Sequence, residues 1–184
     1  MYRTTKINKE QVLLEQGKSI FTTTDLAVLW EIDNQNTLLK TLSRYESKGT
    51  LKRLAKGVYT KKKIEDLHPF EIGCAIGGAY SYISAESILA QSGIIMQEVT
   101  EVTMFGKVTK VFEINNIKYS VRYLNPKYLL NRIGINYKDN YYAASLLRAV
   151  ADIQHISPNY YFDNMLSINQ AELANLKAEL GYKP

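Results

Sequence analysis

The polar side of a predicted helix over residues 35–48 carries the side chains in this sequence best suited to contact a nucleic acid. At about 100° per residue, Leu38, Leu42 and Tyr45 fall on one stripe that can pack against a core. The opposite side carries amides, hydroxyls and cations, namely Asn36, Thr37, Lys40, Ser43, Arg44 and Ser47. Such groups donate to phosphates and to base edges in the major groove. A solvated surface helix has the same pattern, so this helix alone does not decide between the two interpretations.

A basic hairpin is predicted directly after that helix. Gly49 ends the helix, and residues 50–54 and 58–62 read as two strands around the turn 55–57, with Leu51 and Leu54 anchoring the base. Six cations are expected to point outward, namely Lys52, Arg53, Lys56, Lys61, Lys62 and Lys63. Cations on a short hairpin beside a helix of groove size suit contact with phosphates or an adjacent minor groove. The predicted DNA-binding residues are therefore Asn34, Asn36, Thr37, Lys40, Thr41, Arg44, Lys52, Arg53, Lys56 and Lys61.

The charge of the chain is unevenly distributed. The 184 residues carry a net charge of +5. Residues 1–63 hold 13 Lys+Arg and 6 Asp+Glu, or 13 − 6 = +7, whereas residues 64–184 hold 10 and 12, or 10 − 12 = −2. This asymmetry indicates a domain that binds a polyanion joined to a nearly neutral domain. A basic surface that serves only solubility is the alternative.

The elements that would position these cations form a winged helix-turn-helix over residues 1–63. A first helix is predicted over residues 9–17, with Gly17 as a left-handed C-terminal cap. An extended segment over 19–22 follows, and Thr23 or Thr24 is expected to cap a short second helix. The second helix is followed by a turn without glycine and then by the predicted recognition helix.

A hinge is predicted over residues 64–69, followed by a second domain over residues 70–184. Its pattern mixes helices with strands, including a hairpin around Asn115-Asn116 and a helix over 85–91 capped by Ser84. Two longer helices are predicted over residues 140–156 and 169–180. The whole chain is therefore expected to be α+β.

Composition narrows the class of protein further. With 46% hydrophobic and 22% charged residues, the chain has the composition of a folded soluble protein. Its apolar runs are far shorter than the roughly 18 residues that span a bilayer, and we expect no secretion signal after Met1. The single cysteine, Cys74, lies in an apolar run and is interpreted as a small buried thiol. These features favour the cytoplasm.

An enzyme in the second domain is the main rival interpretation. A restriction-type nuclease needs an acidic residue and a Glu-x-Lys pair on adjacent strands, and the spacing of Glu113 and Lys118 does not fit. His68 and His155 have no partners at metal-ligand spacing. We therefore predict no catalytic residue, metal or cofactor. A protein-interaction module is the other alternative, because 11 of the 14 tyrosines lie after residue 63 and exposed tyrosine suits interfaces.

Three blocks of sequence resemble a known family, the AbiE-type antitoxins of type IV toxin–antitoxin systems. Residues 53–59 (Arg-Leu-Ala-Lys-Gly-Val-Tyr) look like the family's wing signature. Residues 80–89 resemble its next block, a strand that enters a helix, and residues 141–152 are similar to a third. The blocks keep the family's order and span most of the chain.

The resemblance implies an N-terminal DNA-binding domain and a C-terminal antitoxin domain. It also implies that the protein represses its own promoter by binding inverted repeats in double-stranded DNA. A functional partner is implied as well, a nucleotidyltransferase-type toxin that is countered without a stable protein complex. A homodimer would fit this role, because palindromic operators match DNA-binding proteins with two-fold symmetry.

Overall fold

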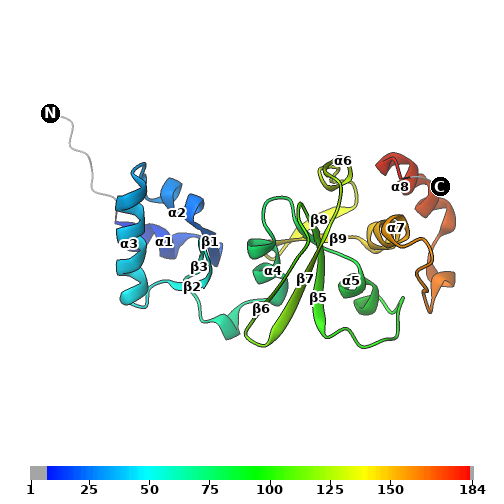
Figure 1. The fold of residues 1–184 in the computed structure, drawn as a ribbon, viewed down its shortest axis with the longest axis horizontal. Helices are drawn as coiled ribbons and strands as arrows, with labels where there is room; N and C mark the ends of the chain where they lie inside the picture. The colour runs from blue at the N-terminus through cyan, green and yellow to red at the C-terminus, as the bar shows by residue number, and fades with distance from the viewer. Residues whose placement is uncertain (1–7, 183–184) are drawn as a thin grey trace. The chain divides into compact units, whose positions relative to one another are not determined.

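The chain divides into two compact units in the computed structural model, which describes residues 8–182. Unit 1 comprises residues 1–68 and unit 2 comprises residues 69–184 (Figure 1). The boundary falls within the predicted hinge 64–69, where Ile64–Asp66 form a short 3-10 helix, η1. Unit 1 contains a three-stranded sheet and unit 2 a six-stranded sheet, each accompanied by helices, which confirms the α+β class. Across residues 8–182, no helix is long and apolar enough to cross a membrane.

Unit 1 packs three helices with a small antiparallel sheet. Its elements in chain order are α1 (Lys9–Glu15), β1 (Ile20–Thr22), α2 (Thr23–Leu29), α3 (Gln35–Ser47), β2 (Lys52–Ala55) and β3 (Val58–Thr60). The strand order is β1-β3-β2, so β3 is central and β2 is an edge strand. The predicted hairpin is thus confirmed, and β1 joins it as a third strand.

The core of unit 1 gathers one apolar side from every helix. Leu38, Leu42 and Tyr45 of α3 are buried there, as the helical spacing predicted. They join a cluster completed by Leu13, Phe21, Leu26, Trp30, Leu51 and Tyr59. The Trp30 ring contacts Tyr45 at 5.0 Å between centroids, and its Nε1 donates to the carbonyl of Lys9 at 3.0 Å. Burial of this stripe fixes which side of α3 faces solvent.

Two predicted helix caps in unit 1 are wrong. Thr22, rather than Thr23 or Thr24, caps α2: its hydroxyl accepts from the backbone N–H of Asp25, and the Asp25 carboxylate accepts in return from the Thr22 N–H. This is a reciprocal capping box. Gly17 is not a left-handed cap, because α1 ends at Glu15 and Gln16 is its C-cap in an extended conformation.

Unit 2 is built on a mixed sheet with helices on both faces (Figure 1). In chain order its elements are α4 (Pro69–Gly77), β4 (Tyr82–Ile83), α5 (Glu86–Gln91), β5 (Glu101–Gly106), β6 (Lys110–Ile114), β7 (Ile117–Tyr123), α6 (Pro126–Leu129), β8 (Ile135–Lys138), β9 (Tyr141–Ala144), α7 (Leu146–Ile156), η2 (Met165–Ser167) and α8 (Gln170–Leu180). The strand order is β6-β7-β5-β4-β9-β8. Helix α4 covers one face, α5 and α7 lie on the other, and α8 packs on α7.

The predicted helix over residues 140–156 is wrong in its first part. Tyr141–Ala144 form strand β9, which pairs with β8, and helix α7 begins only after Ser145. The turn between β8 and β9 places Asp139 at φ 49° and Asn140 at φ 68°. The recognised hairpin turn at Asn115 and Asn116 likewise has both residues at positive φ. Short polar residues tolerate this conformation, which two-residue hairpin turns require.

A buried polar network occupies the centre of unit 2. Arg148 and Asp152 of α7 are both fully buried and form an ion pair at 2.8 Å. The Asp152 carboxylate also accepts from the hydroxyls of Tyr82 and Tyr182. Ser84, predicted to cap α5, instead donates its hydroxyl to Asp152 at 3.2 Å, and α5 begins without a side-chain cap.

The remaining donors of Arg148 are also satisfied. Its guanidinium donates to the carbonyls of Tyr128, Asn131 and Ile133 and to the hydroxyl of Tyr82. Burial raises the pKa of the Tyr82 hydroxyl, and the negative charge of Asp152 adds to that rise. The hydroxyl therefore stays protonated and remains a donor to the carboxylate.

Candidate nucleic-acid interface

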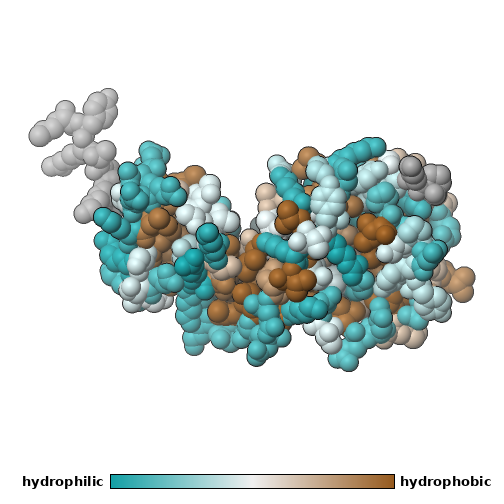
Figure 2. Space-filling model, viewed as in Figure 1, coloured by the Kyte–Doolittle hydropathy of each residue, from teal (hydrophilic) through white to brown (hydrophobic). Residues whose placement is uncertain are grey.

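The exposed side of α3 presents a continuous polar surface without a carboxylate. Asn36, Thr37, Lys40 and Arg44 are all exposed, as predicted, together with Ser43 and Ser47. The one acidic side chain of α3, Glu46, projects about 120° away from the centre of this surface at 100° per residue. The Arg44 guanidinium lies 5.6 Å from the centre of the Tyr45 ring, a cation–π contact at the edge of this surface. In Figure 2 the side chains along the α3 side of unit 1 are predominantly hydrophilic.

Asn34 has a structural role at the start of this surface. It is the N-cap of α3, and its Oδ1 accepts from the backbone N–H of Thr37 at 3.0 Å and from the Thr37 hydroxyl at 3.2 Å. The side-chain amide of Asn34 is left to donate outward from an exposed position. Asn34 therefore both fixes the first turn of α3 and stays beside the predicted contact residues.

Thr41, which the sequence predicted as a DNA contact, is not exposed on this surface. Thr41 is 8% exposed and faces the core side of α3. Its hydroxyl donates to the backbone carbonyl of Thr37 at 2.8 Å. A threonine hydroxyl inside a helix can donate its hydrogen bond to the backbone carbonyl of the preceding turn. That hydrogen is then not available to a ligand outside the helix.

The β2–β3 hairpin is short, and its tip is held against the start of α2. Lys52 and Arg53 are exposed on β2, and Lys56 is exposed in the turn that follows. The next residue, Gly57, has φ 76°, and its carbonyl accepts from the backbone N–H of Thr23 at 2.9 Å. This contact fixes the turn that carries Lys56. The Arg53 Nε donates to the carbonyl of Ala55 at 3.3 Å, which holds its side chain along the edge strand.

The prediction that Lys61 points outward is wrong. Its ammonium group donates to the backbone carbonyls of Leu13, Leu14 and Gln16 at the end of α1. Carbonyls at a helix C-terminus lack partners within the helix and attract a cation. Lys61 thus satisfies the end of α1, the role that the sequence suggested for Gly17.

One cation that suits this surface was not among the predicted contacts. Lys48 is the exposed C-cap residue of α3 and follows Lys40 and Arg44 at steps of four residues. Residues four apart lie on the same side of a helix. The three cations therefore form a row along α3, and the same spacing in the sequence was the signal that could have found Lys48.

Glu113, the acidic residue considered for a nuclease, lies on β6 of unit 2, and two other glutamates of that unit, Glu101 and Glu86, are paired with cations. Lys118 of β7 stands between Glu113 of β6 and Glu101 of β5 in the strand register, and its ammonium lies 2.9 Å from Glu101. Glu86 of α5 pairs with Arg122 at 2.8 Å. Within residues 8–182, no group of three or more histidine, cysteine, aspartate or glutamate side chains is arranged to hold a metal ion.

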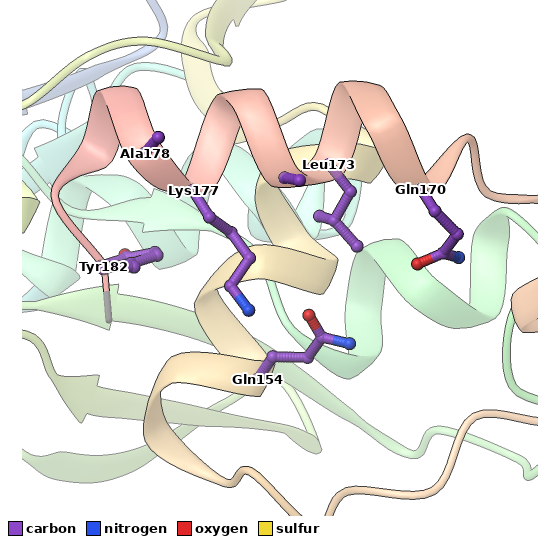
Figure 3. A pocket seen from close by; sticks show the side chains of 7 residues that line it. Gln154, Gln170, Leu173, Lys177, Ala178 and Tyr182 are labelled. Carbon is purple, nitrogen blue, oxygen red and sulfur yellow. The ribbon is translucent and has the colours of Figure 1, made fainter. Parts of the chain in front are cut away.

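A pocket of about 480 Å³ lies between α7 and α8 (Figure 3). Its aliphatic lining comes from α8, through Leu173, Ala174 and Ala178. Lys177 and Gln154 extend into it from opposite walls. The Tyr182 hydroxyl at one end is bonded to Asp152 and belongs to the buried network. This lining could hold a small anion, but it brings together no nucleophile and base.

Cys74 and His155, singled out in the sequence, both have packing roles. Burial raises the pKa of the Cys74 thiol to about 11, and its Sγ lies 3.4 Å from the carbonyl of Tyr142. A thiol with a raised pKa is a poor nucleophile at neutral pH. His155 stacks on Tyr182 with ring centroids 4.1 Å apart, and burial lowers its pKa.

Comparison with known proteins assigns no family to the chain. No model of a known protein family matches it, and no curated protein matches it. Function therefore has to be inferred from the residues and their geometry.

Proposed function

We propose that unit 1 is a winged helix-turn-helix that binds double-stranded DNA in a sequence-specific manner. The observation that carries this proposal is the surface of α3, where Asn36, Lys40 and Arg44 are exposed together and no carboxylate interrupts them. An α-helix fits the major groove, and these side-chain types are the ones that read base edges or grip phosphates there. The element order of unit 1 and the net charge of +7 over residues 1–63 agree with this class.

The roles of the contact residues follow from their positions. Asn36, Thr37, Lys40 and Arg44 enter the groove, and Lys48 at the end of α3 binds the backbone. Lys52, Arg53 and Lys56 of the hairpin hold phosphates beside the groove, where each neutralised phosphate adds about 0.9 to the salt slope. Asn34 caps the helix and orients its first turn toward the DNA. A homodimer would place two such helices on half-sites about 34–36 Å apart.

Within this class, we propose that the protein is a cytoplasmic repressor that autoregulates its own promoter as the antitoxin of a type IV toxin–antitoxin system. This step rests on the resemblance of residues 53–59, 80–89 and 141–152 to AbiE-type antitoxins. The partner would be a nucleotidyltransferase-type toxin whose action is countered without a stable complex. Expression of the chain together with the product of the adjacent gene tests this step. Growth rescue supports it, and unrelieved toxicity contradicts it.

DNA binding is tested separately from the antitoxin role. Purified protein is titrated onto labelled DNA from upstream of its own gene, with random duplex as competitor, and the protected bases are mapped by footprinting. The proposal expects retention on the upstream DNA and a protected inverted repeat. Retention by neither duplex would favour a protein-interaction module instead. Metal-dependent turnover that is lost in Glu113→Gln would favour a nuclease.

A further inference from the structure

Four exposed tyrosines lie along one end of the six-stranded sheet of unit 2. Strands β5 and β7 are parallel and end together, because Gly106 pairs with Tyr123. Strand β4 runs antiparallel to β5 and parallel to β9, so both β4 and β9 begin at this same end. Strand β8 runs antiparallel to β9 and ends there. Tyr80, Tyr142 and Tyr137 are 52%, 42% and 61% exposed, and we call these three the tyrosine row. Tyr123, 50% exposed, points to the opposite face of the sheet, because its neighbour Arg122 pairs with Phe105 on the face of Tyr142.

Two cations link the members of this row. The Lys107 ammonium lies 4.8 Å from the centre of the Tyr80 ring, and the Arg132 guanidinium lies 4.6 Å from that of Tyr142. Arg132 also donates to the backbone carbonyl of Tyr80 at 3.0 Å. The rings of Tyr142 and Tyr137 are 4.9 Å apart. Contacts therefore continue without a break from Lys107 to Tyr137.

The charge at this end of the sheet differs from that of the unit as a whole. Residues 69–184 hold 10 Lys+Arg and 10 Asp+Glu, which gives 10 − 10 = 0. The segments at this end are residues 78–81, 106–110, 123–125 and 137–142. They hold three cations, Lys107, Lys110 and Lys138, against one acid, Asp139, or 3 − 1 = +2. Arg132 precedes β8 at the opposite end of that strand, and its guanidinium reaches the row from there. Neither Lys107 nor Arg132 forms an ion pair with a carboxylate among the described residues.

Tyr80 is held in a backbone conformation that a bulky residue rarely adopts. Its φ is 68°, in the left-handed region, and the preceding Gly78 has φ 100°. Strained residues of this kind concentrate at ligand sites, where the surrounding structure enforces them. Here the hydrogen bond from Arg132 holds the carbonyl while the ring remains half exposed. The strain thus keeps an aromatic face in solvent rather than in the core.

We propose that this end of unit 2 binds single-stranded nucleic acid. Unpaired bases would stack on the tyrosine row, and Lys107 and Arg132 would bind the phosphates. Stacking on aromatic rings together with a basic track is how proteins bind single strands without reading sequence. The row runs from β4 across β9 to β8, and two strand spacings of about 4.8 Å give it a span of roughly 10 Å, which accommodates about two nucleotides. A duplex keeps its bases inside the helix and does not offer them to these rings. The site is separate from the duplex-binding surface proposed for unit 1.

The test measures binding of the full chain to single strands by fluorescence anisotropy. The probes are labelled oligothymidylates of 4, 8 and 16 nucleotides and a 16-nucleotide oligouridylate, which distinguish DNA from RNA. Tyr142→Leu and Tyr80→Leu are expected to weaken binding about tenfold, whereas Tyr142→Phe and Tyr80→Phe keep a ring and bind like the parent. Tyr161→Leu is the matched control, because Tyr161 is 78% exposed outside the row. Circular dichroism verifies that each variant is folded.

Two further measurements distinguish binding at this site from nonspecific charge attraction and from binding by unit 1. Lys107→Gln should reduce the salt slope by about 0.7, the value for one contact to a single strand. Lys56→Ala in unit 1 should leave the Tyr142 effect unchanged. The proposal is overturned if no oligonucleotide binds, if the Leu variants bind like Tyr161→Leu, or if polyglutamate competes as well as oligothymidylate.

Discussion

Units 1 and 2 use the same kinds of side chain in opposite ways. On α3 of unit 1, Lys40 and Arg44 are exposed and form no ion pair among the described residues. In the centre of unit 2, Arg148 and Asp152 are completely buried, and each is surrounded by hydrogen-bond partners from several elements. A buried charge with all its partners contributes to folding, whereas exposed cations without partners remain available to a ligand. Burial and pairing, rather than residue type, separate the two roles.

Among the variants that test this comparison, removal of the Asp152 carboxylate should have the largest effect on the free energy of unfolding. Asp152→Asn leaves the charge of Arg148 buried without its counter-ion, which costs about 3–5 kcal/mol. Trp30 is the only tryptophan and lies in the core of unit 1, so its fluorescence reports that unit alone. In urea, the circular dichroism transition of unit 2 should shift down while the Trp30 transition stays in place.

Glu113→Gln serves as the control for that experiment, because Glu113 is exposed on β6. Its loss should change the free energy of unfolding by less than about 0.5 kcal/mol. If Asp152→Asn changes the stability of unit 2 as little as this control does, the buried network does not support the fold.

Lys61 tests whether one cation of unit 1 belongs with the buried group rather than with the DNA surface. Lys61→Met keeps the aliphatic stem but leaves the carbonyls of Leu13, Leu14 and Gln16 without their donor. We expect a loss of about 1–3 kcal/mol in the Trp30 transition, with DNA affinity of the folded protein nearly unchanged. The exposed neighbour Lys62 provides the matched control through Lys62→Met. If the two variants were equally stable, the ammonium group of Lys61 would not stabilise unit 1, and Lys61 would belong with the exposed cations of the DNA surface.

Lys56 should show the opposite behaviour. Lys56→Ala is expected to leave stability within about 0.5 kcal/mol of the parent, because the side chain is exposed. It should weaken binding to all duplexes alike and reduce the salt slope by about 0.9, measured by anisotropy over a range of salt concentrations. Lys177→Ala removes the same charge from unit 2 and should leave the slope unchanged. A slope unaffected by Lys56→Ala would exclude the hairpin turn from the interface.

The last expected effect appears only at alkaline pH. Burial raises the pKa of Cys74 from 9.0 to about 11, so its contribution to the stability of unit 2 is complete below pH 9 and is lost as pH rises through 11. Urea midpoints for unit 2 should therefore fall between pH 9 and 11. The fall should be shallower in Cys74→Ala, and identical slopes would show that the thiol is not desolvated.

The sequence correctly predicted the elements that are specified by the spacing of residues close together in the chain. The stripe of Leu38, Leu42 and Tyr45 identified both α3 and its exposed side, and Asn115-Asn116 marked a hairpin turn. These patterns depend on spacing within one element. For the same reason, the exposure of Lys40 and Arg44 could be predicted before the fold was known.

The wrong predictions for Lys61, Ser84 and β9 have a different cause, which is a contact between distant parts of the chain. Lys61 is 45 to 48 residues from the carbonyls that it binds, and Ser84 is 68 residues from Asp152. The sequence of β9 predicts helix because its alanines and the apolar run into α7 fit a helical period. Pairing with β4 and β8 decides otherwise, and only the Asp139-Asn140 turn gave a local sign of it.

The most direct test of the central proposal compares affinities for two duplexes in two proteins. Dissociation constants for upstream DNA and for random duplex of equal length are measured at one salt concentration, for the parent chain and for Lys40→Ala. We expect the parent to prefer upstream DNA by about 10³-fold or more. Lys40→Ala should reduce that preference by the equivalent of about 1–3 kcal/mol while remaining folded. Equal affinity of the parent for both duplexes, or an equal loss on both in Lys40→Ala, would contradict base reading by α3.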